Sequence, residues 1–395
     1  MNKLILLIKK KRLKIIGLLS GTSADGVDAC LAEIMEIKGR MRIRQLAFKT
    51  YPFSEDVGNL IFKLSDPTYQ NLDELLRLDV VLGKFFARKA VKLIKDFGYE
   101  KKEIDLIGSH GQTIRHLPRP FLCLGQKVKA PCHIGDPSVI AGTTGITTVG
   151  DVRRADMASG GEGAPLSPLA HFMLFNSPGT PQVVLNLGGI ANLTILPGTE
   201  IIDDVWGFDT GPANMIVDSL TKKYFGKKFD RDGRIAFSGK VNLRLLTFLK
   251  KDGYFKRKPP KSTGRERFGK GFLKKIAEYK KMHRLKSEDL VTTVSELSVQ
   301  TIGESFFGLV KTKKQIQRLI LAGGGVHNQY FTLRLKELFS PIEVVTSESF
   351  GYNPDSIEAL TFALFAYLTI KGRTGNIKKV TGAKKEAVLG KICLG

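Results

Sequence analysis

The 395-residue chain has few cysteines, and none of them are paired at metal-ligand spacing. Cys30, Cys123, Cys132 and Cys393 form no CxxC motif, which argues against a zinc ribbon. The six histidines show no HExxH spacing, the signature of one class of zinc protease. A reducing compartment fits this cysteine usage best, and we expect a cytoplasmic protein.

Long apolar runs are also missing. No stretch of 18 apolar residues occurs, so we expect no membrane span. The apolar segment 4–8 is too short for the core of a signal peptide, and basic residues follow it instead of preceding it.

Acidic residues are scarce relative to basic ones: 38 Asp and Glu stand against 62 Lys and Arg, giving a net charge of +24. Such a surplus can indicate nucleic acid, acidic lipid or an anionic substrate as the partner, or simply a solvated basic surface. The lysines are scattered, with short runs only at 9–12 and 256–267, and no aromatic residues interleave with them as in single-strand binding proteins. This pattern favours the solvated surface, and we expect no nucleic-acid partner.

Strand-like and helix-like segments alternate along the chain, which predicts an α/β protein. The length suggests two domains, which we place at residues 1–150 and 151–395, with the last segment able to pack back on the first domain. We expect strands at 15–20, 27–37, 41–50, 104–109, 145–151, 183–187, 190–196 and 318–322, and helices at 72–97, 290–309, 328–339 and 356–370.

Three glycine-rich turns each follow a short apolar run, at 21–26, 188–189 and 323–325. Glycine lets backbone N–H groups approach phosphate oxygens, so three such turns suggest a nucleotide held from several sides. The motif GxxxxGK[ST] is missing, so this is not a Walker A site. The first two turns each connect two predicted strands, which suggests two similar half-domains.

Carboxylates stand close to these turns. Asp25 and Asp28 flank the first one, where they could hold Mg²⁺ through waters or cap the turn. Asp209 lies at a predicted strand exit just before a helix expected to begin near Pro212. It could be a general base or an N-terminal helix cap.

Other polar residues gather at predicted strand ends. The run 110–113 (HGQT) suits hydroxyl or amide groups, although His110 alone could be a structural residue. Arg153 and Asp156 belong to an acid–arginine cluster that suits an anionic sugar substituent or an interdomain ion network. Glu358, on the last long helix, could support the catalytic aspartate or lie on the surface.

Taken together, these motifs resemble the anhydro-N-acetylmuramic acid kinases, which have the actin–hexokinase–Hsp70-like fold. The resemblance runs nearly end to end, and the order of its motifs is more specific than any one of them. Those motifs are SGTSADGVD at 20–28, HGQT at 110–113, IGDP at 134–137, the segment 151–168, NLGGIAN at 186–192, GFDTGPAN at 207–214, PPKSTGR at 259–265, GGG at 323–325 and TGA at 381–383.

The resemblance implies two actin-like (ribonuclease H-like) domains with a central ATP and substrate cleft. It also implies an ATP-dependent kinase of peptidoglycan recycling, which hydrolytically opens the 1,6-anhydro ring of 1,6-anhydro-N-acetylmuramic acid and phosphorylates O6. Mg²⁺ is expected mainly on the ATP phosphates, with Asp25 or Asp28 as its candidate protein partners, and a homodimer is expected.

By the same resemblance, Asp209 matches the proposed catalytic aspartate. The implied ATP-binding residues are Gly21, Thr22, Ser23, Ala24, Asp25, Gly26, Val27, Asp28, Gly188, Gly189, Asn192, Gly323, Gly324 and Gly325. The implied substrate-binding residues are His110, Gln112, Thr113, Arg153, Asp156, Asn214 and Glu358.

The chain departs from the family pattern in three places: Ala24 replaces a larger apolar residue, Cys132-His133 precedes the IGDP motif, and the basic segment 1–12 lies outside the resemblance. Three other functions stay open. They are a kinase of the same fold acting on an ordinary amino sugar, a chaperone or filament ATPase on the same scaffold, and a nucleic-acid-binding protein.

Overall fold

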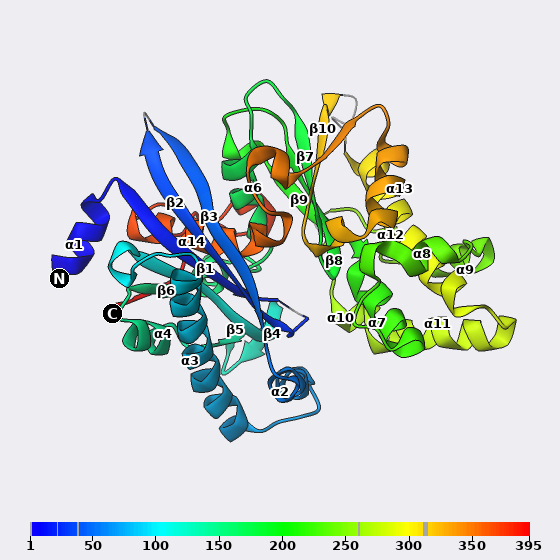
Figure 1. The fold of residues 1–395 in the computed structure, drawn as a ribbon, viewed down its shortest axis with the longest axis horizontal. Coiled ribbons are helices and arrows are strands. Elements are labelled where there is room, and N and C mark those ends of the chain that lie inside the picture. The colour runs from blue at the N-terminus through cyan, green and yellow to red at the C-terminus, as the bar shows by residue number, and fades with distance from the viewer. Residues whose placement is uncertain (1, 22, 38, 260, 311–314) are drawn as a thin grey trace. The chain divides into compact units, whose positions relative to one another are not determined.

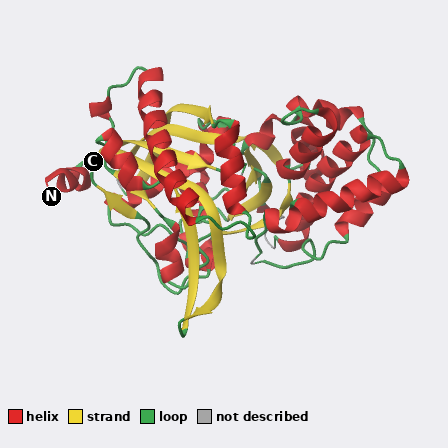
Figure 2. Cartoon of the chain, turned by 90° about the horizontal axis from the view of Figure 1, so that it is seen from below, coloured by secondary structure: helices red, strands yellow, loops and turns green. Residues whose placement is uncertain are grey.

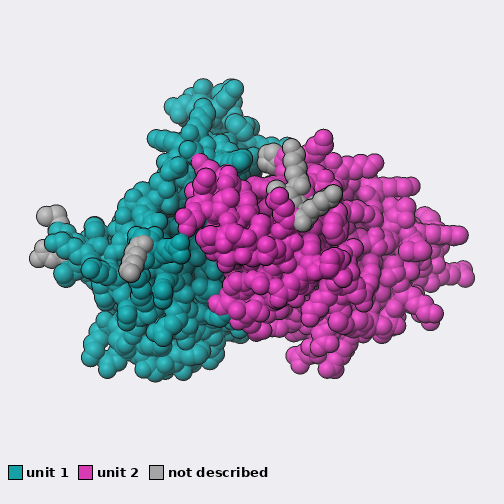
Figure 3. All heavy atoms as spheres, turned by 90° about the horizontal axis from the view of Figure 1, so that it is seen from above, with its two compact units in different colours: residues 1–174, 351–395 teal, residues 175–350 magenta. Residues whose placement is uncertain are grey.

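The computed structural model describes residues 2–21, 23–37, 39–259, 261–310 and 315–395 (Figure 1). The chain divides into two compact units, residues 1–174 with 351–395 (unit 1) and residues 175–350 (unit 2), coloured separately in Figure 3. The sequence places a boundary near residue 150, whereas the contacts place it at 174. One physical reason is that Asp156 is hydrogen-bonded to Asn376 and Thr381, which ties its helix to the C-terminal segment of unit 1.

Unit 1 contains a seven-stranded mixed sheet in the order β12-β6-β4-β1-β2-β3, with β5 paired to β4. Strand β1 is antiparallel to β2 and parallel to β4, and β4 is parallel to β6. The strands are β1 (Arg12–Ser20), β2 (Gly26–Ile37), β3 (Arg40–Pro52), β4 (Leu106–Cys123), β5 (Gln126–Ile134), β6 (Thr148–Gly150) and β12 (Lys391–Cys393).

This sheet is contacted by the helices α2 (Glu55–Ser65), α3 (Leu72–Asp96), α4 (Pro137–Thr144), α5 (Arg153–Ala158) and α14 (Ile357–Ile370) (Figures 1 and 2). Unit 1 also contains α1 (Asn2–Lys9), which contacts α14, the short α15 (Lys378–Thr381), and α6 (Ser167–Phe175), which ends at the boundary with unit 2. Because strand side chains alternate between faces, Ile16 and Leu18 join the core formed with α3, while Gly17 between them faces α14. A Cβ on Gly17 would lie 1.9 Å from the carbonyl oxygen of Ala359, so glycine permits the close approach of α14.

Unit 2 contains a five-stranded sheet in the order β11-β10-β7-β8-β9. Its strands are β7 (Gln182–Leu187), β8 (Ile190–Leu196), β9 (Trp206–Pro212), β10 (Arg318–Ala322) and β11 (Glu343–Thr346). Strand β7 is antiparallel to β8 and parallel to β10, just as β1 is to β2 and β4. The two sheets therefore repeat one topology, and the predicted α/β class with two actin-like halves is confirmed.

The helices of unit 2 surround a large apolar core. They are α7 (Asn214–Phe225), α8 (Arg234–Ser238), α9 (Leu243–Lys250), α10 (Arg265–Phe268), α11 (Lys270–His283), α12 (Ser287–Leu309) and α13 (Gln329–Phe339). Helix α12, expected at 290–309, is buried on almost every side over 290–306 because α7, α8, α9, α13 and β9 all contact it. Among the described residues, no helix combines the length and apolar character needed to cross a membrane.

The expected strand at 104–109 is longer than its apolar run suggests. Strand β4 continues through the HGQT motif to Cys123, because β5 pairs with its second half. Gly111, at a φ of +72°, lets the strand bend at this motif. His110 and Gln112 therefore lie within a strand instead of at its end.

Candidate active-site residues in the two units

In unit 1 the first glycine-rich turn is tied to the HGQT motif by buried hydrogen bonds. The Ser20 hydroxyl lies 2.9 Å from the Gly26 carbonyl oxygen and 2.5 Å from Oε1 of Gln112. The Gln112 amide in turn donates to the carbonyl oxygens of Gly21, at 3.4 Å, and Thr113, at 3.2 Å. Gln112 is 1% exposed, so its side chain holds the turn in place from beneath.

The turn itself is compact. The Ala24 N–H donates to the Gly21 carbonyl at 3.2 Å, and Ala24 adopts a left-handed φ of +50°. Ser23 donates to the Asp25 carboxylate at 2.7 Å. Gly26 allows the next strand to approach, because a Cβ there would lie 2.6 Å from the Tyr51 carbonyl oxygen. Val27 is fully buried in the core, and Thr22 lies outside the described residues.

Asp28 lies in the first part of β2, the strand that leaves this turn, and accepts a hydrogen bond from Thr50 at 2.5 Å. Burial raises the pKa of Asp28 to about 7, against the lowering effect of Thr50, and the carboxylates of Glu358, Asp25 and Asp355 raise it further. A cation would relieve this repulsion, so the site fits Mg²⁺ electrostatically. Among the described residues, no group of three His, Cys, Asp or Glu side chains is arranged to hold a metal ion.

His110 and Arg153 form a second polar centre in unit 1. The His110 Nδ1–H donates to the Ser20 carbonyl at 3.2 Å, and Nε2 accepts from Arg153 at 3.1 Å. A carbonyl can only accept, so this pairing fixes a neutral tautomer. Burial and the Arg153 charge lower the pKa of His110 to about 3. Arg153 also donates to the Gly163 carbonyl at 2.7 Å, and Glu358 contributes a favourable charge to it.

Two histidines beside this centre were not among the predicted site residues. Nδ1 of His116 and Nε2 of His133 are buried without a hydrogen-bond partner among the described residues. The His133 ring packs edge-on against His110 at 5.1 Å. Burial lowers the pKa of both, so they add neutral polar groups to the centre. His133 belongs to the noted Cys132-His133 departure, a signal that sequence reasoning did not use.

Asp156 plays a structural part. Its fully buried carboxylate accepts hydrogen bonds from the Gly163 N–H at 2.8 Å, and from Asn376 and Thr381 at 2.7 Å each. A Cβ on Gly161 would lie 2.1 Å from the same carboxylate. Asp156 therefore shapes the 160–163 turn. A direct contact between Asp156 and the sugar stays a prediction.

In unit 2 Asp209 lies in β9, opposite Asn192 of β8 and next to a register shift in their pairing. Its backbone N–H donates to the Lys261 carbonyl at 3.1 Å, and its own carbonyl accepts from the Tyr254 hydroxyl at 2.8 Å. The carboxylate Oδ2 accepts from the Thr263 N–H at 2.9 Å. The carboxylate is thus held by Thr263, the backbone by Tyr254 and Lys261, and no side chain of the described residues caps the helix α7 that follows.

Burial raises the pKa of Asp209 to about 7. The Thr263 hydrogen bond lowers this pKa, the Glu266 carboxylate raises it, and the Lys261 charge lowers it. A carboxylate with a pKa near neutrality can both accept and release a proton at physiological pH. Asp209 therefore has the properties that a general base needs.

The other glycine turns of unit 2 meet near the start of α7. The Ala213 N–H donates to the Gly189 carbonyl at 2.9 Å and the Asn214 N–H to the Gly188 carbonyl at 3.1 Å. The Asn214 amide also donates to the Leu187 carbonyl at 3.0 Å.

The 323–325 turn reaches the same place. A Cβ on Gly323, at a φ of +82°, would lie 2.5 Å from the Asn186 side chain, and one on Gly325 would lie 2.6 Å from Leu187. Gly324 begins the short 3₁₀ helix η5 (Gly324–His327) that precedes α13. Unit 2 thus brings together every site residue predicted in it.

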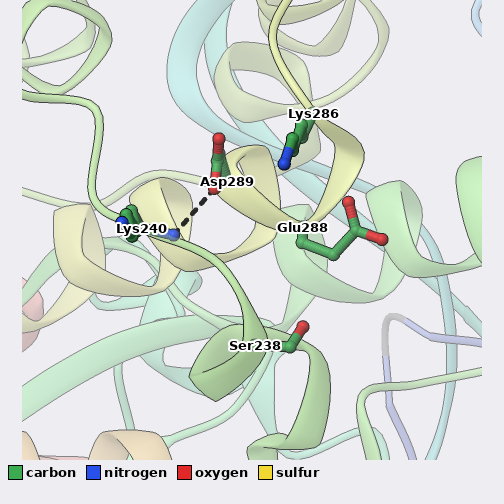
Figure 4. A pocket seen from close by; sticks show the side chains of 5 residues that line it. All are labelled: Ser238, Lys240, Lys286, Glu288 and Asp289. Atoms are coloured by element: carbon green, nitrogen blue, oxygen red, sulfur yellow. Dashed lines mark hydrogen bonds between the residues drawn. The ribbon is translucent and has the colours of Figure 1, made fainter.

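A surface pocket of unit 2 lies elsewhere and contains none of the predicted residues. It is lined by Ser238, Lys240, Lys286, Glu288 and Asp289, around the start of α12 (Figure 4). The Lys240 backbone N–H donates to Asp289 at 2.7 Å (Figure 4). The pocket contains none of the predicted site residues, so we do not assign it to the reaction.

Comparison with known proteins shows which protein family this chain resembles. A family described as anhydro-N-acetylmuramic acid kinase matches residues 13–395. A protein of Caldanaerobacter subterraneus subsp. tengcongensis named anhydro-N-acetylmuramic acid kinase is 41% identical over 399 residues, covering 100% of both chains. A Salinibacter ruber protein of the same name is 38% identical over 392 residues, covering 99% of both chains.

Proposed function

We propose, since the chain belongs to the anhydro-N-acetylmuramic acid kinase family, that Asp209 is the general base of that family's reaction in this protein. We assign the family's activity to the chain: ATP-dependent conversion of 1,6-anhydro-N-acetylmuramic acid and water to N-acetylmuramic acid 6-phosphate and ADP, in cell-wall recycling. The observation that supports the role of Asp209 is its fixed carboxylate with a pKa near 7.

The internal 1,6 bridge of the substrate is a glycosidic bond, and Asp209 would act on it as the base carboxylate does in an inverting glycosidase. Asp209 takes a proton from water while the water oxygen forms a bond to C1. The bond between C1 and O6 breaks, and O6 takes the γ-phosphoryl group of ATP, leaving ADP. The proton on Asp209 then returns to solvent. No separate protein acid is required, because phosphoryl transfer consumes the negative charge on O6.

The glycine-rich turns at 21–28 and 188–189 are our candidates for contacts with the ATP phosphates, with 323–325 on the adenosine side. Backbone N–H groups at such turns can donate to phosphate oxygens. Mg²⁺, when bound with ATP, would neutralise phosphate charge, and Asp25 and Asp28 are the residues of this chain that would face it. His110, Gln112, Thr113, Arg153, Asn214 and Glu358 remain candidates for sugar contacts. A homodimer and a cytoplasmic location remain expectations.

Product analysis in ¹⁸O-labelled water tests the coupled reaction. The protein is given ATP and the anhydro sugar, and the early product is examined by mass spectrometry. We expect one labelled oxygen at the anomeric carbon of a 6-phosphate. Unlabelled product incubated in the same water controls for exchange. Label found in phosphate instead would contradict the proposal, as would equal phosphorylation of N-acetylmuramic acid itself, which would indicate an ordinary amino-sugar kinase.

A further inference from the structure

Lys261 is the most unusual charged residue of unit 2. It is only 4% exposed, and its Nζ has no hydrogen-bond partner among the described residues. The Nζ lies 5.0 Å from the ring centroid of Tyr254 and 5.6 Å from that of Phe208. Burying an ammonium group without a hydrogen-bonding partner opposes folding, because water solvates the charge better than two aromatic faces do. Packing therefore does not explain why a lysine occupies this position.

The residues around the Lys261 side chain also contact or adjoin Asp209. The Lys261 carbonyl accepts the Asp209 backbone N–H, and Tyr254, whose ring contacts Nζ, donates its hydroxyl to the Asp209 carbonyl. Phe208, the other ring beside Nζ, directly precedes Asp209 in β9. These contacts hold Lys261 against the backbone of Asp209, where its buried charge favours ionisation of the carboxylate that we assign as the base.

We propose that Lys261 is a positioning residue of the reaction, a buried positive charge that keeps the Asp209 carboxylate ionised and therefore able to take a proton from water. The inference rests on the proposed function of Asp209. Lys261 acts through Asp209 and does not touch the sugar, since its Nζ is shielded from solvent.

The neighbouring charges agree with this role. Burial lowers the pKa of Lys261 to about 8, Arg257 lowers it further and Asp209 raises it, so the lysine is still mostly charged at neutral pH. Facing Asp209, Glu266 of α10 opposes ionisation of the carboxylate, while Lys261 favours it. Tyr254 is held neutral, because burial and then Asp209 raise its pKa far above neutrality. Arg267 acts on Tyr254 and is paired with Asp252. Lys261 is thus the cation that favours Asp209 ionisation most directly.

The test compares the pH dependence of kcat/KM for the anhydro sugar in the wild type, Lys261→Met, Lys261→Arg and Lys281→Met. Methionine matches the length of lysine without its charge, and the exposed Lys281 gives the same change in net charge away from this site. We expect the acid limb of Lys261→Met to move to higher pH, because removal of a nearby positive charge raises the pKa of a carboxylate. Lys261→Arg should restore the limb towards its wild-type position, and Lys281→Met should leave it unchanged.

Thermal unfolding separates this role from a structural one. Lys261→Met should melt at the same or a higher temperature than the wild type, because it removes a buried unpaired charge. If Lys261→Met does not fold, Lys261→Gln is measured in the same way. A collapse of the melting temperature in both variants would show a structural lysine and overturn the proposal. An unmoved acid limb, or an equal loss of activity at every pH, would also overturn it.

The Asp209→Asn variant distinguishes failure of this inference from failure of the proposed function. If Asp209 is the base, its residual activity should lack the acid limb. If the limb persists in Asp209→Asn, the proposed function is wrong. If the limb is lost there but stays at the wild-type pH in Lys261→Met, only the role of Lys261 is wrong.

Discussion

Asp28 of unit 1 and Asp209 of unit 2 have pKa values raised to about 7, but their surroundings differ. Both values are set mainly by burial. The charges that raise the pKa of Asp28 further are the carboxylates of Glu358, Asp25 and Asp355. Around Asp209 a carboxylate, Glu266, is opposed by the buried ammonium of Lys261. The same pKa is therefore compatible with two different proposed roles, a cation partner in unit 1 and a general base in unit 2.

A perturbed pKa indicates a functional site without specifying what the site does. The role follows from the partners. Asp28 accepts a hydrogen bond from Thr50, and no positive charge of the described residues is among the main causes that shift its pKa. Asp209 accepts a hydrogen bond from the Thr263 N–H, and the positive charge of Lys261 lowers its pKa.

Replacing each carboxylate by asparagine should change different kinetic constants. Asp209→Asn should lower kcat by about 10²–10⁴-fold, the usual contribution of general base catalysis. Asp28→Asn should act mainly on the KM for ATP with Mg²⁺, because Asp28 would meet the reaction through the phosphates. Steady-state kinetics with ATP varied at saturating sugar measures both. Equal losses of kcat in the two variants would contradict the assignment of different roles to Asp209 and Asp28.

Two glycines of unit 1 should differ in how much an added methyl group changes stability. In unit 1 Gly17→Ala should destabilise the protein by about 3 kcal/mol, because its Cβ would overlap the Ala359 carbonyl oxygen of α14. Gly142→Ala in α4, where a Cβ meets nothing within 4 Å, is the matched control and should stabilise by about 0.5 kcal/mol or more. Urea unfolding measures both changes. A similar result for the two variants would contradict the close packing of α14.

A third test uses the pH dependence of stability. The fold raises the pKa of both aspartates above the ordinary value of 3.8, so the folded state binds protons that the unfolded state releases. Wild-type stability should therefore fall as the pH rises from about 4 to about 7, and the asparagine variants should escape this loss. We expect each variant to gain about 1–3 kcal/mol relative to wild type between about pH 5 and about pH 8.

The gain should be larger for Asp28→Asn, which removes repulsion from three carboxylates, than for Asp209→Asn, which deprives Lys261 of its counter-charge. Urea unfolding at both pH values gives the comparison. If the difference in unfolding free energy between variant and wild type does not change with pH, neither carboxylate has a raised pKa in the folded protein.

The smallest effect concerns the neutral centre of unit 1. Arg153→Lys should raise the KM for the sugar by about tenfold with little change in kcat, because lysine cannot donate along two fixed directions to Gly163 and His110. The conservative change Arg154→Lys, at a largely exposed neighbour, is the control. A loss confined to kcat would instead place Arg153 in the chemical step.

Much of this fold could be predicted from the sequence, because its signals are local. Apolar runs followed by Gly188-Gly189 or Gly323 predict strands that end in tight turns, and the structure has β7 and β10 there. The length of β4 could not be predicted in this way, since its second half exists through pairing with β5. The all-round burial of α12 likewise depends on helices distant in sequence.

The candidate site divides in the same manner. Asp209 and the glycine turns stand in recognisable motifs, and unit 2 brings its share of them together. Lys261 stands in the PPKSTGR motif that we had noted, yet nothing local shows that its ammonium is buried between two rings. The structural part of Asp156 was equally hidden, because its partners Asn376 and Thr381 are more than 200 residues away in sequence.

Chemical rescue of Asp209→Ala is the direct test of whether Asp209 is the general base. With the base removed, turnover of the anhydro sugar should fall at least about 100-fold, and added formate or azide should restore part of it by replacing the missing carboxylate. Turnover within about threefold of the wild type, with no response to either anion, would contradict the assignment of Asp209 as the base.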